Sequence, residues 1–254
     1  MGTKFSTRIW VSVVGIASIF FGSKGYADTV ISVADFGLKP DTRENAVAYV
    51  QKAIEACRGK EPVTLVFPEG RYDFWPQYAH EKNYYETNTY DVFPKRLAML
   101  FEGFHNITVD GNGSQFVMHD RIQPITVENC DGVTLKNFSI DWDIPLTAQA
   151  RVIKVGSDFF EIEINVLESP YIIEDGKLVF VGEGWKSALG SMIEFESDTH
   201  FVVPGTGDLV LGRNWRDYTA VSPRYGIVRL SRKGGFERYP AEGNWLVLRH
   251  STRD

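Results

Sequence analysis

A repeat constrains this chain more than any other feature of its sequence. The segment 99–109 matches the segment 125–135 position for position, at an offset of 26 residues. Each copy has a short apolar strand, a polar or glycine corner and a second, alternating strand. A unit this thin cannot bury its own apolar face, so copies of it stack into a solenoid. Because no helix pattern separates the strands, the sequence predicts a parallel β-helix whose two copies lie one above the other in parallel.

The N-terminus has the pattern of a secretory signal peptide. Two basic residues, Lys4 and Arg8, precede the apolar run Ile9–Phe21, and Gly25-Tyr26-Ala27 supplies small residues for cleavage. The apolar run is shorter than the roughly 20 residues that span a membrane, although an uncleaved anchor stays an alternative. We therefore expect an exported protein, periplasmic or secreted, that has no membrane attachment once the signal is removed near Asp28.

The composition limits the possible partners and cofactors. A net charge of −6 argues against a nucleic-acid partner, which requires a basic surface. Aromatic residues make up 13% of the chain, which suits packing against sugar rings, although aromatic residues also favour β-strands. Cys57 and Cys130 lack the spacing of metal ligands, and we expect two separately buried thiols. The sequence predicts no metal site and no cofactor.

The change of pattern along the chain predicts an all-β protein. We expect a right-handed parallel β-helix with a short N-terminal capping helix, over 44–57, and an inserted antiparallel β-barrel-like domain of hairpins. Residues 75–98 break the repeat and are expected to form an inserted loop. The expected parts are the signal peptide 1–27, the first β-helix coils 28–148, the inserted barrel or sandwich 149–242, and a return strand of the β-helix over 243–254.

The return strand bears on the extent of the protein. Trp245–His250 is an apolar strand that would resume the solenoid, and the chain stops at Asp254. A resumed coil with nothing stacked upon it would leave an open sheet edge. We therefore expect this sequence to be the N-terminal part of a longer protein.

Several motifs resemble known β-helix proteins. Val33-Ala34-Asp35-Phe36-Gly37, the segment 66–72 and the segment 107–113 are similar to the opening and first coils of pectin-lyase-like proteins. A narrower pattern joins the segment 138–145, which leads into the barrel, with Trp245–His250 after it. That combination resembles glycoside hydrolase family 110, the bacterial exo-α-galactosidases that remove terminal α-1,3-linked galactose, including the blood-group B epitope.

The resemblance implies a metal-independent inverting hydrolase that acts on terminal α-galactosyl oligosaccharides or glycoconjugates. Inversion requires two carboxyl groups about 6.5–9.5 Å apart. In the family the catalytic acids lie on coils that follow the barrel, so the resemblance places the catalytic pair downstream of Asp254 and implies an inactive chain. Two alternatives stay open, a noncatalytic carbohydrate-binding β-helix piece and a calcium-dependent pectate-lyase-like enzyme. The latter would use the coil carboxylates Asp110, Asp120, Asp131 and Asp141.

Five residues near the ends of the barrel are candidates for contact with a sugar. Asp141 and Asp143 point to one side of a strand. They are weak candidates for acid and base, suit hydroxyl binding better, and are alternatively structural. Trp142 is either a stacking platform or a plug at the domain junction. Arg249 and His250 would donate hydrogen bonds to hydroxyls or pair with an outer carboxylate.

Overall fold

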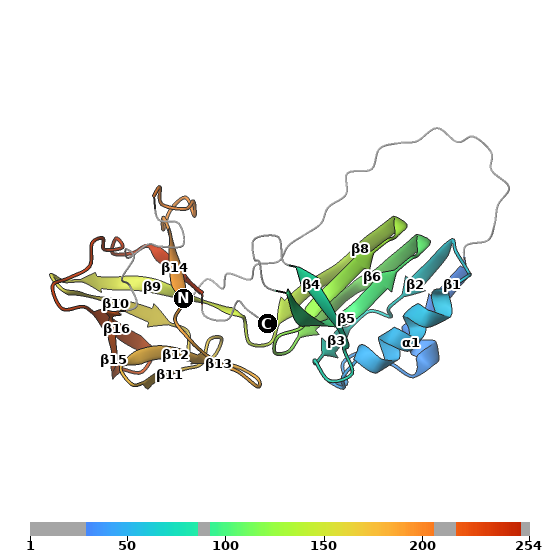
Figure 1. Cartoon of the computed structure of the whole chain (residues 1–254), viewed down its shortest axis with the longest axis horizontal. Helices are drawn as coiled ribbons and strands as arrows, with labels where there is room; N and C mark the ends of the chain where they lie inside the picture. Colours follow the sequence, from blue (N-terminus) through green and yellow to red (C-terminus); the bar gives the residue numbers. More distant parts are fainter. Residues whose placement is uncertain (1–28, 86–91, 206–216, 250–254) are drawn as a thin grey trace. The chain divides into compact units, whose positions relative to one another are not determined.

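The computed structural model describes residues 29–85, 92–205 and 217–249 (Figure 1). The predicted signal peptide and His250 therefore lie outside the described residues. Within these ranges, no helix is both long and apolar enough to cross a membrane.

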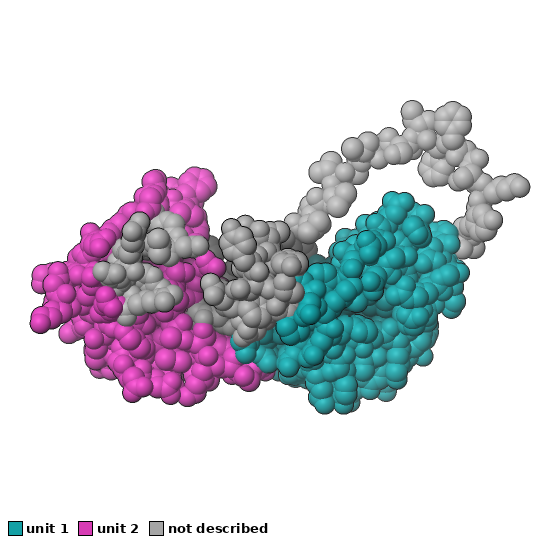
Figure 2. Space-filling model, in the orientation of Figure 1, with its two compact units in different colours: residues 1–143 teal, residues 144–254 magenta. Residues whose placement is uncertain are grey.

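The chain forms two compact units, Met1–Asp143 and Ile144–Asp254, which Figure 2 draws in different colours. Each unit has its own core of buried apolar side chains. The described residues are mostly in strands, so the all-β expectation is confirmed. The domain boundaries predicted from the sequence, apart from the last strand discussed below, stay a prediction.

The described residues of unit 1 form two sheets and one α-helix. In the first sheet the long strand β6 is central, because β2 and β3 pair with its two halves and β8 pairs along it. In the second sheet β5 lies between β4 and β7. The elements are β1 (Thr29–Ser32), a 3-10 turn (Val33–Phe36), α1 (Val47–Cys57), β2 (Val63–Val66), β3 (Arg71–Phe74), β4 (His80–Tyr85), β5 (Val92–Glu102), β6 (His105–Met118), β7 (Gln123–Glu128) and β8 (Asp131–Trp142).

The strand register confirms the predicted stacking of the two repeat copies. β5 and β7 are parallel with Met99 opposite Ile125, and β6 and β8 are parallel with Ile107 opposite Val133. Both pairings keep the offset of the sequence repeat. The two sheets are separate and neither is closed, so the strand register shows parallel stacking but not a closed β-helix.

The offset of the β6–β8 pairing changes between Asp110 and Ser114, a span that begins with Gly111. Before this glycine β6 follows the repeat, and after it Ser114 lies opposite Phe138, so β8 is two residues shorter there. A Cβ on Gly111 would approach Phe138 Cβ to 2.5 Å and Asn137 O to 2.7 Å. The close approach lets the Phe138 ring stack on Phe116, with centroids 4.8 Å apart. Glycine is therefore required where the two strands change register.

The predicted amphipathic helix is present and completes the core of unit 1. Its buried residues Val47, Val50, Ala53, Ile54 and Cys57 lie on one face, in agreement with the helical period of the sequence. Cys57 and Cys130 are both free thiols, and Cys57 is buried as expected, whereas Cys130 is only half-buried. Burial raises the pKa of the Cys57 thiol to about 11, so this cysteine is an inert core residue.

The segment 75–98 is not the expected loop, since it contains β4 and the first half of β5, paired antiparallel. A contact of β4 explains why the hairpin lies against the repeat. Glu102 and Glu128 lie opposite each other on β5 and β7, where two like charges repel. Lys82 Nζ donates to both, at 2.9 and 2.6 Å. The pairing of Lys82 with these two glutamates could not be predicted from the sequence, because Glu102 and Glu128 are 20 and 46 residues away along the chain.

Unit 2 contains two antiparallel sheets around a separate core, which agrees with the antiparallel character expected for the inserted domain. The larger sheet has the order β14-β17-β9-β10-β16-β15 and the smaller one the order β11-β12-β13. The strands are β9 (Thr147–Val155), β10 (Phe159–Ile164), β11 (Tyr171–Glu174), β12 (Lys177–Val181), β13 (Lys186–Ala188), β14 (Ser191–Phe195), β15 (Thr219–Arg224), β16 (Ile227–Ser231) and β17 (Trp245–Arg249).

The last strand corrects one expectation. β17 was expected over 243–254 as the solenoid starting again, but it is antiparallel to β9 and β14, with Leu246 opposite Ala150 and Glu194. Its alternate residues Leu246 and Leu248 are fully buried in the unit 2 core. An apolar alternating strand fits either sheet equally well, so the sequence pattern did not identify the partner strands.

Replacing Gly111 tests the register change. We expect Gly111→Ala to lower the free energy of unfolding by about 1–3 kcal/mol, because the new Cβ must displace the Asn137 carbonyl and Phe138. The matched control is Gly103→Ala, where a Cβ meets nothing within 4 Å and only the positive φ of 70° costs free energy. Urea unfolding of both variants measures the difference. Equal losses in the two variants would show that the close packing at Gly111 is unimportant.

Candidate functional site

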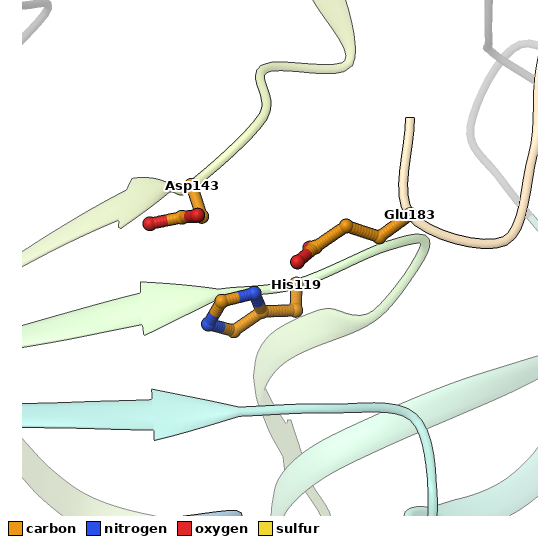
Figure 3. A group of neighbouring side chains, drawn as sticks. All are labelled: His119, Asp143 and Glu183. Carbon is orange, nitrogen blue, oxygen red and sulfur yellow. The ribbon is translucent and has the colours of Figure 1, made fainter. Parts of the chain in front are cut away.

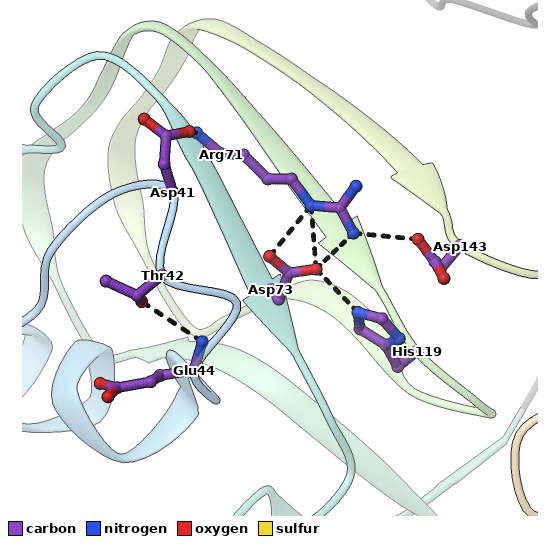
Figure 4. Close-up of polar contacts among 7 residues, drawn as sticks. All are labelled: Asp41, Thr42, Glu44, Arg71, Asp73, His119 and Asp143. Atoms are coloured by element: carbon purple, nitrogen blue, oxygen red, sulfur yellow. Dashed lines mark hydrogen bonds and ion pairs between the residues drawn. The ribbon is translucent and has the colours of Figure 1, made fainter.

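A charged cluster in unit 1 is centred on Asp73, whose side chain has an exposed fraction of 0%. Arg71 donates to it from Nε at 3.0 Å and from Nη2 at 2.5 Å, and His119 Nε2 lies 2.8 Å from Asp73 Oδ1. Arg71 Nη2 also donates to Asp143 Oδ1 at 2.9 Å (Figure 4). Asp41 fixes the start of β3 by accepting a hydrogen bond from Arg71 N at 2.9 Å. The guanidinium thus joins one buried and one partly exposed carboxylate.

The strand register places these residues side by side. Trp75 follows the last residue of β3, His119 that of β6 and Asp143 that of β8. The strand β6 pairs with both β3 and β8, and the three strands end at the same level. The backbone ladder continues into the row, because His119 N donates to the carbonyl of Phe74 and Asp143 N to that of Met118. The Trp75 ring stacks on His119 with centroids 3.7 Å apart and planes 9° apart. Trp75, His119 and Asp143 therefore form a row because their three strands are paired side by side.

Figure 3 shows His119 and Asp143 at the ends of their strands. A ring nitrogen of His119 and a carboxylate oxygen of Asp143 lie within 4.8 Å of each other. Glu183, which Figure 3 also labels, is a residue of unit 2 and follows β12. His119 and Asp143 by themselves supply two ligand atoms, fewer than the three or four that a protein zinc site uses.

The electrostatics of the cluster keep Asp73 ionised. Burial alone would raise the pKa of this carboxyl group, but the hydrogen bonds from Arg71 and His119 outweigh burial and hold the pKa below its usual range. A carboxyl group with a lowered pKa is a poor proton donor at neutral pH. Asp73 is therefore suited to hold Arg71 and His119 in place, and not to act as a general acid.

An open cleft of about 710 Å³ adjoins the cluster. Its wall, the segment 75–79, is held by side chains of the helix region: Asn45 Oδ1 accepts from Trp75 N at 3.2 Å and Asn45 Nδ2 donates to the Gln77 carbonyl at 2.9 Å. Gln51 Nε2 donates to the Tyr78 carbonyl at 2.8 Å. The cleft is lined by Arg43, Asn45, the segment 75–79, Glu81, Arg96 and Asp120.

Trp75 and Asp120 connect the cleft with the strand ends. Trp75 both lines the cleft and stacks on His119, and Asp120 follows His119 in the chain. Trp142 Nε1 donates to the Asp120 carbonyl at 3.2 Å, which fixes the backbone at this corner. The cleft therefore has a rigid aromatic wall and a rigid acidic corner.

Three of the five predicted sugar contacts lie at this end of unit 1. Asp141 Oδ1 accepts a hydrogen bond from Trp142 N at 2.8 Å, and Asp143 is paired with Arg71. Trp142 is partly buried and packs against the unit 1 core. Arg249 lies in unit 2 on β17, and His250 is outside the described residues. A sugar-binding role of these five residues stays a prediction.

The four coil aspartates of the calcium alternative do not form a ligand set. Over the described ranges, no group of three or more neighbouring metal-ligand side chains includes any of them. Asp110 is engaged by Lys136 at 3.2 Å and Asn137 at 3.0 Å, and Asp141 by a backbone amide. Calcium needs six to eight oxygens, which this arrangement does not supply.

Most of this cluster was not predicted from the sequence. Asp143 was a candidate there, but Arg71, Asp73, Trp75 and His119 were not. One usable pattern was present, because Arg71 and Asp73 alternate along one strand and so share a face. The position of Asp143 beside His119 depends on the shortened register of β8, which the 26-residue repeat does not contain.

Comparison with known proteins identifies relatives over most of the chain. Residues 148–246 match the family described as GLAA-B beta-barrel domain I. The chain is 56% identical over 230 residues to alpha-1,3-galactosidase B of Bacteroides thetaiotaomicron, a match that covers 90% of this chain and 37% of the relative. Alpha-1,3-galactosidase A of Shewanella woodyi is 33% identical over 88% of this chain and 36% of the relative. This chain thus spans little more than a third of the length of these relatives.

Neutralising Asp73 tests the cluster. We expect Asp73→Asn to lower the free energy of unfolding at pH 7 by about 3 kcal/mol, because it leaves Arg71 and His119 beside a buried neutral amide. Since the pKa of Asp73 is lowered on folding, its contribution is full above about pH 4 and is lost as the pH falls further. The deficit of the variant should therefore shrink below pH 4, as measured by urea unfolding at several pH values.

Asp143→Asn is the matched control, because this carboxylate contacts the same guanidinium but has a side-chain exposed fraction of 36%. We expect it to cost less than about 1 kcal/mol. A loss for Asp73→Asn that is as small, or that does not change with pH, would contradict the central position of Asp73.

Proposed function

This chain belongs to the alpha-1,3-galactosidase family, glycoside hydrolase family 110, and from that membership we propose the activity of the protein that contains it. The protein is an exo-α-galactosidase that hydrolyses terminal α-1,3-linked galactose, including that of blood-group B-type glycans, with inversion. The high identity to the Bacteroides thetaiotaomicron relative along nearly the whole chain carries the proposal.

The fold that goes with this proposal is a right-handed parallel β-helix. The parallel pairing of β5 with β7 and of β6 with β8 at the repeat offset supports it, and α1 is its capping helix. The edge strand β8 also supports it, since its apolar residues Val133, Leu135, Phe138 and Ile140 are only partly buried against the core. A further coil stacked on β8 would bury them.

Inverting hydrolysis requires a general acid at the glycosidic oxygen and a general base that activates water on the opposite face of the ring. The released galactose then has the β configuration. The local carboxylates are engaged otherwise: Asp73 and Asp143 bind Arg71, and Asp141 accepts a backbone hydrogen bond. We place the catalytic pair outside this chain, so the chain alone binds sugars without hydrolysing them. In this scheme the sugar contacts proposed in unit 1 are Asp141, Trp142 and Asp143, and those proposed in unit 2 are Arg249 and His250.

The same scheme makes export a part of the function. Terminal α-galactosyl groups on oligosaccharides and glycoconjugates are outside the cytoplasm, and the N-terminal pattern of basic and apolar residues would direct the protein to the periplasm or the medium. The partners are glycans, and neither nucleic acid nor membrane takes part once the signal is removed.

A chimera tests the proposed activity. We replace the matching segment of the Bacteroides thetaiotaomicron relative with this chain and expect galactose release from galactosyl-α-1,3-galactose, with β-galactose as the first product in proton NMR. The 254-residue chain alone should release no galactose under the same conditions.

The outcomes separate the parts of the proposal. A folded chimera, with a cooperative thermal transition, that is inactive would contradict the galactosidase role of this chain. Hydrolysis by the chain alone would contradict the position of the catalytic pair but not the activity. An unsaturated product from pectate that depends on calcium would favour the lyase alternative.

A further inference from the structure

The cleft beside the charged cluster has no role in the proposed hydrolysis, since it lies outside the predicted sugar contacts. The geometry points to a saccharide-binding subsite in this cleft, which takes a neutral galactosyl unit with a ring packed on Trp75 and a hydroxyl bound by Asp120. This inference rests on the proposed function for the identity of the sugar, but its site is built from unit 1 alone.

Asp120 supplies an acceptor that the protein does not use. Its Oδ1 atom is buried, and it has no hydrogen-bond donor in the part of the chain that the structure describes. Arg121 Nε is 3.9 Å away, beyond hydrogen-bond distance. Oδ1 itself is closed to a ligand, but the Asp120 side chain has an exposed fraction of 21% and lines the cleft, so a ligand hydroxyl can bind the carboxylate from its exposed side.

The charges in the cleft favour a neutral ligand. Arg43 and Arg96 face Glu81 and Asp120 in the lining, so the two signs balance. Arg96 and Glu81 lie 3.4 Å apart and largely neutralise each other. A phosphate would meet the Asp120 carboxylate, and a cation would meet Arg43. Sugar hydroxyls both donate and accept hydrogen bonds, so a sugar can use a carboxylate and a guanidinium of the same lining.

The aromatic wall is fixed before a ligand arrives. His119 stacks on the Trp75 ring, and Asn45 holds the Trp75 amide. A preorganised wall reduces the entropy lost on binding. The volume of about 710 Å³ is within the range of roughly 300–1,000 Å³ for small-molecule sites. The cleft can therefore hold one or two sugar units, whereas a single ion would leave it mostly empty.

Titration of the full 254-residue chain with methyl α-D-galactopyranoside and with galactosyl-α-1,3-galactose tests the subsite. Proton–nitrogen NMR follows the Trp75 indole N–H, which comparison with Trp75→Phe assigns. We expect saturable shifts of this signal by both sugars. Asp120→Asn should weaken binding about 3- to 10-fold, since one hydrogen bond to a charged acceptor is replaced by a neutral one.

Asp131→Asn is the matched control, because Asp131 is an exposed carboxylate of the same unit and does not line the cleft. It should bind like the wild type. If Asp120→Asn does not fold, Arg43→Gln at an exposed position replaces it, with the same expected weakening. No saturable shift of the Trp75 signal, or unchanged affinity in the folded cleft variant, would overturn the subsite.

The chimera separates this inference from the proposed function. Galactose release by the chimera without any shift at Trp75 would reject only the subsite. Saturable binding at Trp75 in this chain, together with a folded but inactive chimera, would reject only the galactosidase role.

Discussion

Parallel backbone pairing at a fixed register is the constraint on which unit 1 depends. Each coil is too thin to have a core, so its apolar side chains are buried only when the next coil lies in register upon it. Met99 opposite Ile125 and Ile107 opposite Val133 set that register on both sheets. The same pairing also places the carboxylates of Glu102 and Glu128 opposite each other. Lys82 donates a hydrogen bond to each of them and so relieves their repulsion.

The charged cluster follows from the same pairing. Strands that end at one level bring Trp75, His119 and Asp143 into a row, and Arg71 and Asp73 lie beside it on β3. Asp73 then acts as the fixed anion that orients Arg71 and His119, while Trp75 extends the row into the cleft. A rigid support of this kind would suit the proposed saccharide subsite, because it holds the aromatic and polar groups in place before a ligand binds.

Much of this arrangement could be predicted from the sequence, and the rest could not for identifiable reasons. The repeat predicted the register of 99–109 on 125–135, and apolar periodicity predicted α1. The strand β17 was assigned to the wrong sheet because its alternation fits any half-buried partner. The cluster and the cleft depend on side chains far apart in the chain, and a repeat found in only two copies does not reveal where its length changes.

That change of length has a consequence for the chemistry at the strand ends. If the offset of the repeat had continued beyond Gly111, the residue beside His119 would be Pro145 and not Asp143. Proline has no amide hydrogen for the ladder and no carboxylate for Arg71. Because β8 is two residues shorter than the repeat, the position beside His119 is occupied by the carboxylate of Asp143 and the backbone pairing continues there. Parallel strands paired at a repeat offset can therefore present new surface chemistry through a local change of register, without any substitution of the side chains concerned.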